Sequence, residues 1–255
     1  MYHFKSYRKT DVFLRAILFL LVTAVTIPTQ AQAAEQCPTK DRSCVLEQMI
    51  TNAADIDNTA WKDQTYREIV KTLAFEGNFD RALVIFDLIE TPDTKAMTIR
   101  GIGMTLANYK DSPEELTKKF AKLRVKADSI MHPPSRGIAL TYIAMSQAFA
   151  GDNEGAWKTT EDMKNAALQH KAYGETAEIQ AEKGDFKSAK ISIDKIESLS
   201  FRNKAYETIS KILSDNKQYE DAYSAANAIT NAYKKGQAIQ YLLDQQKPRE
   251  RIQQP

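Results

Sequence analysis

The chain has 255 residues, with 35 Lys and Arg against 33 Asp and Glu and a formal net charge of +2. This balance lacks the strongly basic stripe that is typical of nucleic-acid-binding domains, so we do not expect nucleic acid as a partner. Glycine and proline are few, at 9 and 8 residues, and no long strand-like alternation competes with a 3.6-residue apolar period, which favours an all-α fold.

Residues 1–33 have the pattern of a secretory signal peptide. Four basic residues and one acidic residue in 1–15 precede a charge-free run of 12 residues at 16–27. That run is too short to cross about 30 Å of hydrocarbon at about 1.5 Å per residue, and Ala31-Gln32-Ala33 supplies a small-x-small cleavage site. Cleavage leaves 31 basic and 32 acidic residues (35 − 4 and 33 − 1). The sequence therefore predicts a periplasmic or secreted protein, with an uncleaved anchor as the alternative.

Both cysteines, Cys37 and Cys44, follow the predicted cleavage site. Paired thiols persist as disulfides in an oxidising compartment, so we expect one bridge that clips an N-terminal helical segment at 34–59. A metal site is the alternative, but it lacks nearby histidines and a second cysteine pair. A C-x-x-C redox motif is absent.

A six-residue pattern, Gly-Asn/Asp-Phe-x-x-Ala, occurs at 77–82 and again at 184–189, with looser copies at 151–156 and 217–222. The last residues of three copies, Ala156, Ala189 and Ala222, lie 33 residues apart (189 − 156 and 222 − 189). A fixed period of this length is typical of stacked helical hairpins. The glycine is suited to the left-handed conformation that ends the first helix of each pair.

Apolar and aromatic residues keep a fixed register around the marker alanines. A tyrosine stands 16 residues before three of them, at Tyr66, Tyr173 and Tyr206. Apolar residues follow at positions four and seven after the alanine and predict one buried face on the second helix: Phe86 and Ile89, Ile193 and Ile196, Ala226 and Ile229.

With this register, residues 60–246 resemble the tetratricopeptide repeat family, whose pattern has an early aromatic in the first helix and Gly-x-Tyr/Phe-x-x-Ala at the turn. The resemblance implies a right-handed α-solenoid of about five to six stacked helical hairpins. The family's proline at the end of each repeat is missing, since Thr94, Phe201 and Lys234 stand there. The period is also 33 residues and not 34.

The second hairpin is longer than the others. Ser112-Pro113-Glu114-Glu115 predicts a capped helix start, and the helix should run to about Met131 before Pro133 and Pro134 stop it. Its expected apolar stripe is Leu116, Phe120, Leu123, Ala127 and Ile130. Residues 247–255 carry one apolar residue, Ile252, and are expected to form a mobile tail.

One side of this long helix is positive, because Lys118, Lys122 and Lys126 recur every four residues and Lys119 borders them. An anionic lipid, wall polymer or acidic protein surface is one candidate ligand. A solvated face opposite an apolar stripe is the alternative interpretation, since every surface helix needs one.

First helices line the groove of tetratricopeptide-like arrays, and the resemblance places six residues near it. These are Arg67, Lys71, Gly174, Glu178, Glu207 and Lys211. The repeated Lys and Asn of the family's carboxylate clamp are absent, but mixed charges suit a polar peptide. Tyr142, Tyr173 and Tyr206 are either aromatic anchors or packing residues.

Other residues have simpler structural explanations. Gly101 and Gly103 indicate close helix packing, because no strand precedes them as in a phosphate loop. His132, beside two prolines, and His170, expected in a loop, fall in no metal-binding or Ser-His-Asp pattern. Trp61 and Trp157 are expected to be large packing residues.

The leading hypothesis from the sequence is an exported, non-enzymatic scaffold that binds a protein or peptide partner, without cofactor or metal. Extended helical arrays present a large surface and no deep catalytic cleft. The alternative is a peripheral envelope protein that binds anionic lipid or wall polymer through the basic helix. The open ends of such an array also leave homo-oligomers as an option.

Overall fold

The computed structural model describes residues 37–246, and this part of the chain is all helices, turns and loops. The predicted all-α class is therefore confirmed. The predicted signal peptide at 1–33 and the predicted tail at 247–255 lie outside the described residues. The helices, in chain order, are α1 Arg42–Ala54, α2 Thr59–Phe75, α3 Phe79–Phe86, α4 Pro92–Leu106, α5 Pro113–Asp128, α6 Pro133–Ala150, α7 Asn153–Glu161, α8 Ala166–Glu182, α9 Phe186–Asp194, α10 Leu199–Asp215, α11 Tyr219–Ala228 and α12 Ala232–Gln246.

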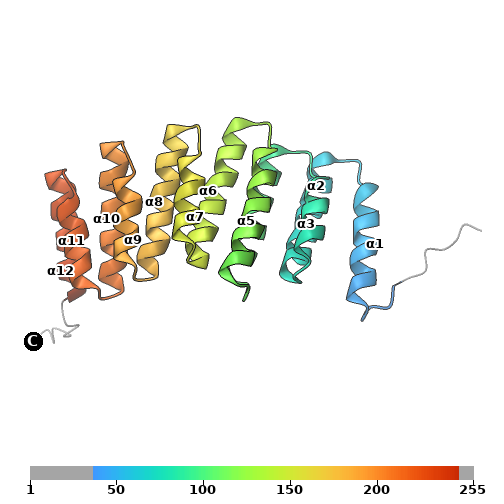
Figure 1. Ribbon diagram of the computed structural model, residues 1–255, viewed down its shortest axis with the longest axis horizontal. Coiled ribbons are helices and arrows are strands. Elements are labelled where there is room, and N and C mark those ends of the chain that lie inside the picture. The colour runs from blue at the N-terminus through green and yellow to red at the C-terminus, as the bar shows by residue number, and fades with distance from the viewer. Residues whose placement is uncertain (1–36, 247–255) are drawn as a thin grey trace, which may run out of the picture.

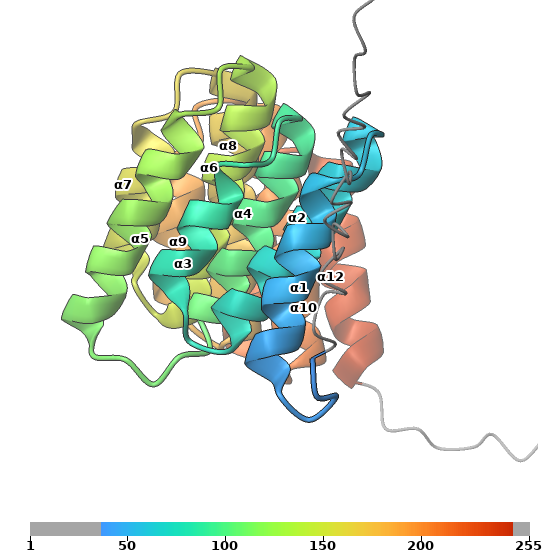
Figure 2. The same ribbon diagram turned by 90° about the vertical axis from the view of Figure 1, so that its right-hand side faces the viewer.

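The helices stand side by side in a row from α1 to α12 (Figure 1). The helices α2, α4, α6, α8, α10 and α12 pack on one another in chain order, and we call them the even layer. The helices α3, α5, α7, α9 and α11 each pack on the even-layer helix before them and form the odd layer. Figure 2, which looks along the row, shows the odd layer on the left and most of the even layer to its right. The superhelical hand expected from the family resemblance stays a prediction.

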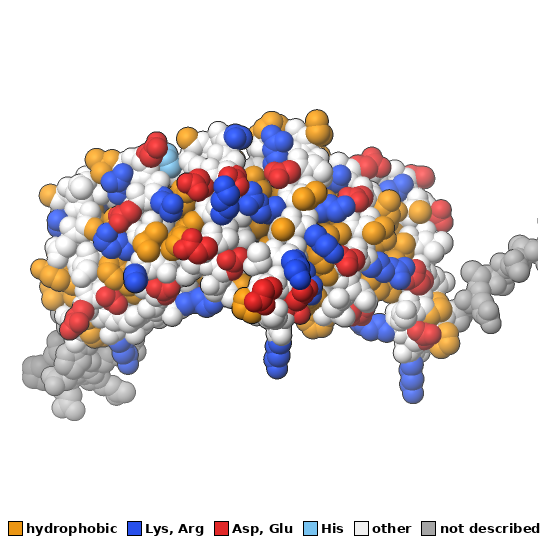
Figure 3. All heavy atoms as spheres, viewed as in Figure 1, with side chains coloured by type: hydrophobic (Ala, Val, Ile, Leu, Met, Phe, Trp, Pro, Cys, Tyr) orange, Lys and Arg blue, Asp and Glu red, His pale blue; other side chains and the backbone are white. Residues whose placement is uncertain are grey.

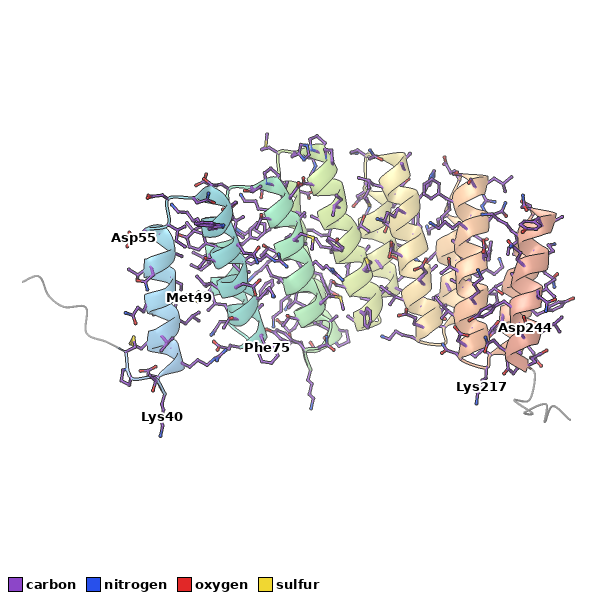
Figure 4. The ribbon with its side chains drawn as sticks, turned by 180° about the vertical axis from the view of Figure 1, so that it is seen from behind. Lys40, Met49, Asp55, Phe75, Lys217 and Asp244 are labelled. Atoms are coloured by element: carbon purple, nitrogen blue, oxygen red, sulfur yellow. A yellow bond between two sulfur atoms is a disulfide. The ribbon has the colours of Figure 1, made fainter. Side chains whose placement is uncertain are left out.

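The turns within the hairpins explain the repeated glycine. Gly77, Gly151 and Gly184 have φ of 83°, 85° and 78°, a left-handed conformation that glycine adopts without a Cβ clash. The next amide then reaches back to the helix that has ended: Asp185 N donates to the carbonyl of Gln180 at 2.8 Å. The fourth copy makes the same turn without glycine, because Lys217 has φ 62°. Figure 4 shows its side chain directed away from the array.

The marker alanines lie where the two helices of a hairpin touch. Ala82, Ala156, Ala189 and Ala222 have no exposed surface, so a larger side chain would push the helices apart. The tyrosines Tyr66, Tyr173 and Tyr206 are buried. The apolar residues four and seven positions after the alanines are also buried, as predicted, and these are Phe86, Ile89, Ile193, Ile196, Ala226 and Ile229. The residues of the repeat pattern therefore form the core of the array.

The long helix α5 begins as predicted, since the Ser112 hydroxyl accepts a hydrogen bond from Glu115 N at 3.3 Å. The Glu115 carboxylate does not complete a capping box but contacts Lys118 instead. Phe120, Leu123 and Ala127 of its apolar stripe are buried. The helix ends at Asp128, ahead of the predicted Met131. The turn between α4 and α5 contains no left-handed residue, unlike the turns that Gly77, Gly151 and Gly184 form.

Glycines also permit the close approach of even-layer helices. A Cβ on Gly103 of α4 would lie 2.5 Å from the Ser146 hydroxyl of α6, and one on Gly137 of α6 would lie 2.5 Å from Leu168 Cδ1 of α8. The prediction of close packing for Gly103 is therefore confirmed. Gly174 of α8 differs, because its Cβ would meet Ala205 at an ordinary 4.0 Å.

The predicted Cys37–Cys44 disulfide is present, with the two Cα atoms 5.6 Å apart. It joins the residues before α1 to the first turn of that helix, where Asp41 accepts a hydrogen bond from Cys44 N at 3.0 Å. Within residues 37–246, no helix has both the length and the apolar character needed to cross a membrane. The packing role expected for Trp61 is wrong, because this side chain is 72% exposed at the start of α2.

Replacing Gly103 by Ala should lower the free energy of unfolding by about 1–3 kcal/mol, the usual cost of overpacking a rigid interface. The matched change Gly174→Ala should leave it unchanged or raise it by up to about 1 kcal/mol, because alanine is the better helix former and space exists. Urea unfolding monitored by circular dichroism checks both. Equal losses in the two variants would contradict the proposed packing.

Backbone strain at the turns gives a second test. Gly151→Ala should cost about 1 kcal/mol, because a left-handed conformation is unfavourable for a residue with a Cβ, and no neighbour lies within 4 Å to add a clash. Lys217→Gly should stabilise the protein by a few tenths to about 1 kcal/mol for the converse reason. Urea unfolding again provides the measurement, and a destabilised Lys217→Gly variant would contradict the equivalence of the two turns.

Candidate functional site

The four lysines of the basic helix α5 all lie against carboxylates. Lys118 contacts Glu115 at 2.7 Å and Lys119 contacts Asp111 at 2.5 Å, both near the start of the helix. Lys122 and Lys126 reach across to Asp80 and Asp87 at 2.7 and 2.6 Å, at the two ends of α3. Figure 3 accordingly shows basic and acidic side chains interspersed over the odd layer. These lysines join α5 to its surroundings, and their charge is compensated locally.

The even layer carries three cavities that follow one another along the row. One, of about 220 Å³, lies between α4, α6 and α8. The next, of about 300 Å³, lies between α8 and α10. The third, of about 670 Å³, lies between α10 and α12. The first two share Glu175 and Glu178 and so meet along α8, whereas the third shares only helix α10 with the second.

The structure brings together only part of the groove residues predicted from the sequence. Glu178 lines two of the cavities, and Glu207 and Lys211 line the third. Arg67 and Lys71 lie on α2, outside these cavities, where Lys71 pairs with Glu68 at 2.7 Å. The series therefore runs from α4 to α12.

Glu178 occupies the most unfavourable electrostatic position of this face. Burial raises the pKa of its carboxyl, and the neighbouring carboxylates Glu175 and Glu182 raise that pKa further. Lys204 of α10 opposes these effects but is the smallest of the four contributions. The protein thus holds a half-buried carboxyl group without the compensation that the α5 lysines receive.

Glu207 has the opposite environment. A hydrogen bond from Lys211 at 2.8 Å lowers the pKa of its carboxyl, and Lys234 of α12 lies 3.7 Å away and adds to the effect. Lys211 also lies over the Tyr241 ring, 6.0 Å from its centroid. These contacts join α10 to α12 beneath the largest cavity.

The tyrosines divide between packing and exposure. Tyr173 and Tyr206 are buried, so for them the packing interpretation is confirmed. Burial raises the pKa of Tyr173 to about 12, and the Tyr206 hydroxyl donates to Asp194 at 2.7 Å. Tyr142 is half-buried and lines the cavity between α4, α6 and α8, with the Arg100 guanidinium 5.4 Å from its ring centroid.

A Ser, a His and an Asp meet near the start of α6 in an arrangement that the sequence did not indicate. His132 Nδ1 lies 2.7 Å from the Ser135 hydroxyl, which itself donates to Asp93. In a catalytic triad the histidine stands between the serine and the carboxylate and takes the serine's proton. Here the serine stands in the middle, donates to the carboxylate and has no exposed surface. The group therefore ties the start of α6 to α4 and lacks the geometry of a nucleophile.

His170 was expected in a loop, and this expectation is wrong. It lies within α8, is 9% exposed, and lines the cavity between α8 and α10. Its ring packs on Phe201 with centroids 5.7 Å apart. The repeat register could have indicated this position. His170 stands three residues before Tyr173, and the buried Asp63 stands three residues before Tyr66.

No protein-family model matches the sequence, and no curated protein matches it. Among solved structures, a crystal structure of Ton1535 from Thermococcus onnurineus NA1 covers 81% of this chain and 86% of its own at 14% sequence identity. Its TM-score is 0.24, and at that value the likeness supports no conclusion about fold or function.

Replacing Glu178 by Gln should stabilise the protein at pH 7. A carboxyl whose pKa rises on folding contributes stability that is complete below its unfolded pKa and is lost as the pH rises through its folded pKa. The glutamine variant escapes that loss, so its advantage over the wild type should be largest at neutral pH and should vanish near pH 3.

The measurement is urea unfolding at pH 3, 5 and 7, with Glu90→Gln, an exposed loop residue, as the control. An equal stability difference at all three pH values would show that the carboxyl of Glu178 is not destabilised by its surroundings.

Proposed function

We propose that this chain is an exported helical-repeat scaffold that binds a protein or peptide partner through its even layer and catalyses no reaction. The observation that carries the proposal is the series of three cavities between α4 and α12. Their combined length suits an extended or helical segment, whereas a small substrate would need one enclosed pocket.

Exposed aromatic side chains support this assignment. Phe149 is 38% exposed at the first cavity and Phe201 is 40% exposed at the second. Tyr233 is 74% exposed at the third. Aromatic residues are enriched among the anchors of protein interfaces because they bury a large apolar area with little loss of side-chain entropy.

The repeat architecture and the compartment form part of the same proposal. The left-handed turns and the buried alanines at a 33-residue period support a divergent tetratricopeptide-like array. The Cys37–Cys44 disulfide supports export to the periplasm or beyond, because such bonds persist in oxidising compartments.

The basic face of α5 is the less suitable docking surface. A lipid headgroup or wall polymer would have to displace Asp80, Asp87, Asp111 and Glu115 from the lysines that they contact. This competition removes much of the attraction that an uncompensated lysine row would offer.

Affinity capture with the secreted chain, followed by a quantitative binding assay with the purified partner, tests the proposal. The double variant Phe149→Ser/Tyr233→Ser should weaken binding at least about tenfold, because buried aromatic anchors typically contribute 2 kcal/mol or more. The matched variant Val84→Ser/Val125→Ser removes two exposed apolar residues of the odd layer and should change the affinity by less than about twofold.

The reverse ranking of the two variants would assign the partner to the odd layer and contradict the proposal. Turnover of a captured molecule by the purified chain would contradict the assignment as a non-enzymatic scaffold.

A further inference from the structure

Three glutamates lie on one side of α8. Glu175, Glu178 and Glu182 are spaced by three and four residues, so they share a helix face, and they line the cavity between α4, α6 and α8. Among the residues that the structure describes, none of the three carboxylates forms an ion pair or a side-chain hydrogen bond. Like charges at this spacing repel one another unless a cation lies between them.

Neighbouring cations are close but do not neutralise this group. The Arg100 guanidinium lies over the Tyr142 ring, and Lys204 only partly offsets the raised pKa of Glu178. Lys171 is exposed at the rim of the second cavity. What distinguishes the α8 glutamates is that Glu175 and Glu178 are partly buried at the cavities, whereas unpaired carboxylates such as Glu90 and Glu154 are exposed.

The walls around the glutamates are apolar and aromatic. Tyr142, Met145 and Phe149 of α6 face them in the first cavity, and Phe201 of α10 lies beside them in the second. Aromatic faces attract ammonium and guanidinium groups, and the alkyl stem of a lysine or arginine packs on such surfaces. The combination of carboxylates and rings suits a cationic side chain better than a free metal ion.

His170 provides an independent indication of a ligand. It is more than nine-tenths buried and lines the cavity that contains Glu175 and Glu178. Within residues 37–246 its ring packs on Phe201 and forms no side-chain hydrogen bond. Its ring nitrogens are not fully buried, so a ligand in the cavity can reach them. A neutral imidazole accepts one hydrogen bond, which an ammonium or guanidinium group donates.

We propose that the two cavities that meet at Glu175 and Glu178 form a subsite for a lysine or arginine side chain of the bound peptide. This assignment rests on the proposed function, since the side chain belongs to the partner of the even layer. The carboxylates hold its charge, the rings of α6 and Phe201 enclose its stem, and His170 accepts one of its N–H groups.

N-acetyl-arginine amide is the probe for this subsite, and N-acetyl-citrulline amide is its neutral isostere. In NMR titrations of the whole secreted chain, the arginine compound should shift the resonances of the His170 imidazole and the Phe201 ring, and the citrulline compound should not. The double variant Glu175→Gln/Glu178→Gln should bind the arginine compound at least about tenfold more weakly, which is the usual effect of losing charged hydrogen-bond acceptors.

The control variant Glu90→Gln/Glu154→Gln removes two exposed acidic charges outside the subsite and should leave the titration unchanged. Equal shifts with arginine and citrulline compounds, or no shift at His170 and Phe201, would overturn the subsite.

The outcome is separable from the proposed function. Partner capture that depends on Phe149 and Tyr233 but is indifferent to Glu175→Gln/Glu178→Gln refutes the subsite alone. Arginine binding without any even-layer partner supports the subsite and refutes the proposed function.

Discussion

The array depends on one backbone constraint that four of its hairpins share, the left-handed residue that ends the first helix. Gly77, Gly151, Gly184 and Lys217 occupy that position, and the amide after each reverses the chain by a hydrogen bond to the preceding helix. The reversal places an alanine five residues later against the first helix, where no larger side chain fits. Because every such hairpin is closed in the same way, its first helix faces the same side of the row, and the even layer becomes one continuous face.

The proposed function rests on a difference between the two layers. The odd layer pairs its charges, as Lys122 and Lys126 do with the aspartates at the ends of α3. The even layer carries three cavities, exposed rings and the α8 carboxylates without an ion pair. A further cavity of about 380 Å³ lies on the odd layer, where acidic residues accompany the lysines that line it. A surface whose charges are internally satisfied has little electrostatic reason to bind, whereas unsatisfied groups at a concave surface gain from a complementary ligand. The proposals of a peptide partner and of a cationic side chain both arise from this contrast.

The local parts of this structure were predictable from sequence, because they depend on residues close together in the chain. The glycine turn, the marker alanine, the Ser112 cap and the Cys37–Cys44 bridge all belong to this group. Contacts between distant residues were not predictable, since Lys122 finds Asp80 only after α3 and α5 have been placed side by side. The cavities also escaped prediction, because the residues that successive even-layer helices contribute to each cavity are more than 20 positions apart in sequence. The prediction of a loop at His170 is wrong because this residue shares the buried register position of Asp63, three residues before the repeat tyrosine.

Site-specific photo-cross-linking in the protein's own compartment would test the central claim most directly. A photoreactive residue replaces Tyr142 of the even layer in one variant and Val125 of the odd layer in another. The account predicts a discrete cross-linked partner from position 142 and none from position 125. A cross-link from position 125 alone would contradict it and place binding on the outer face of α5.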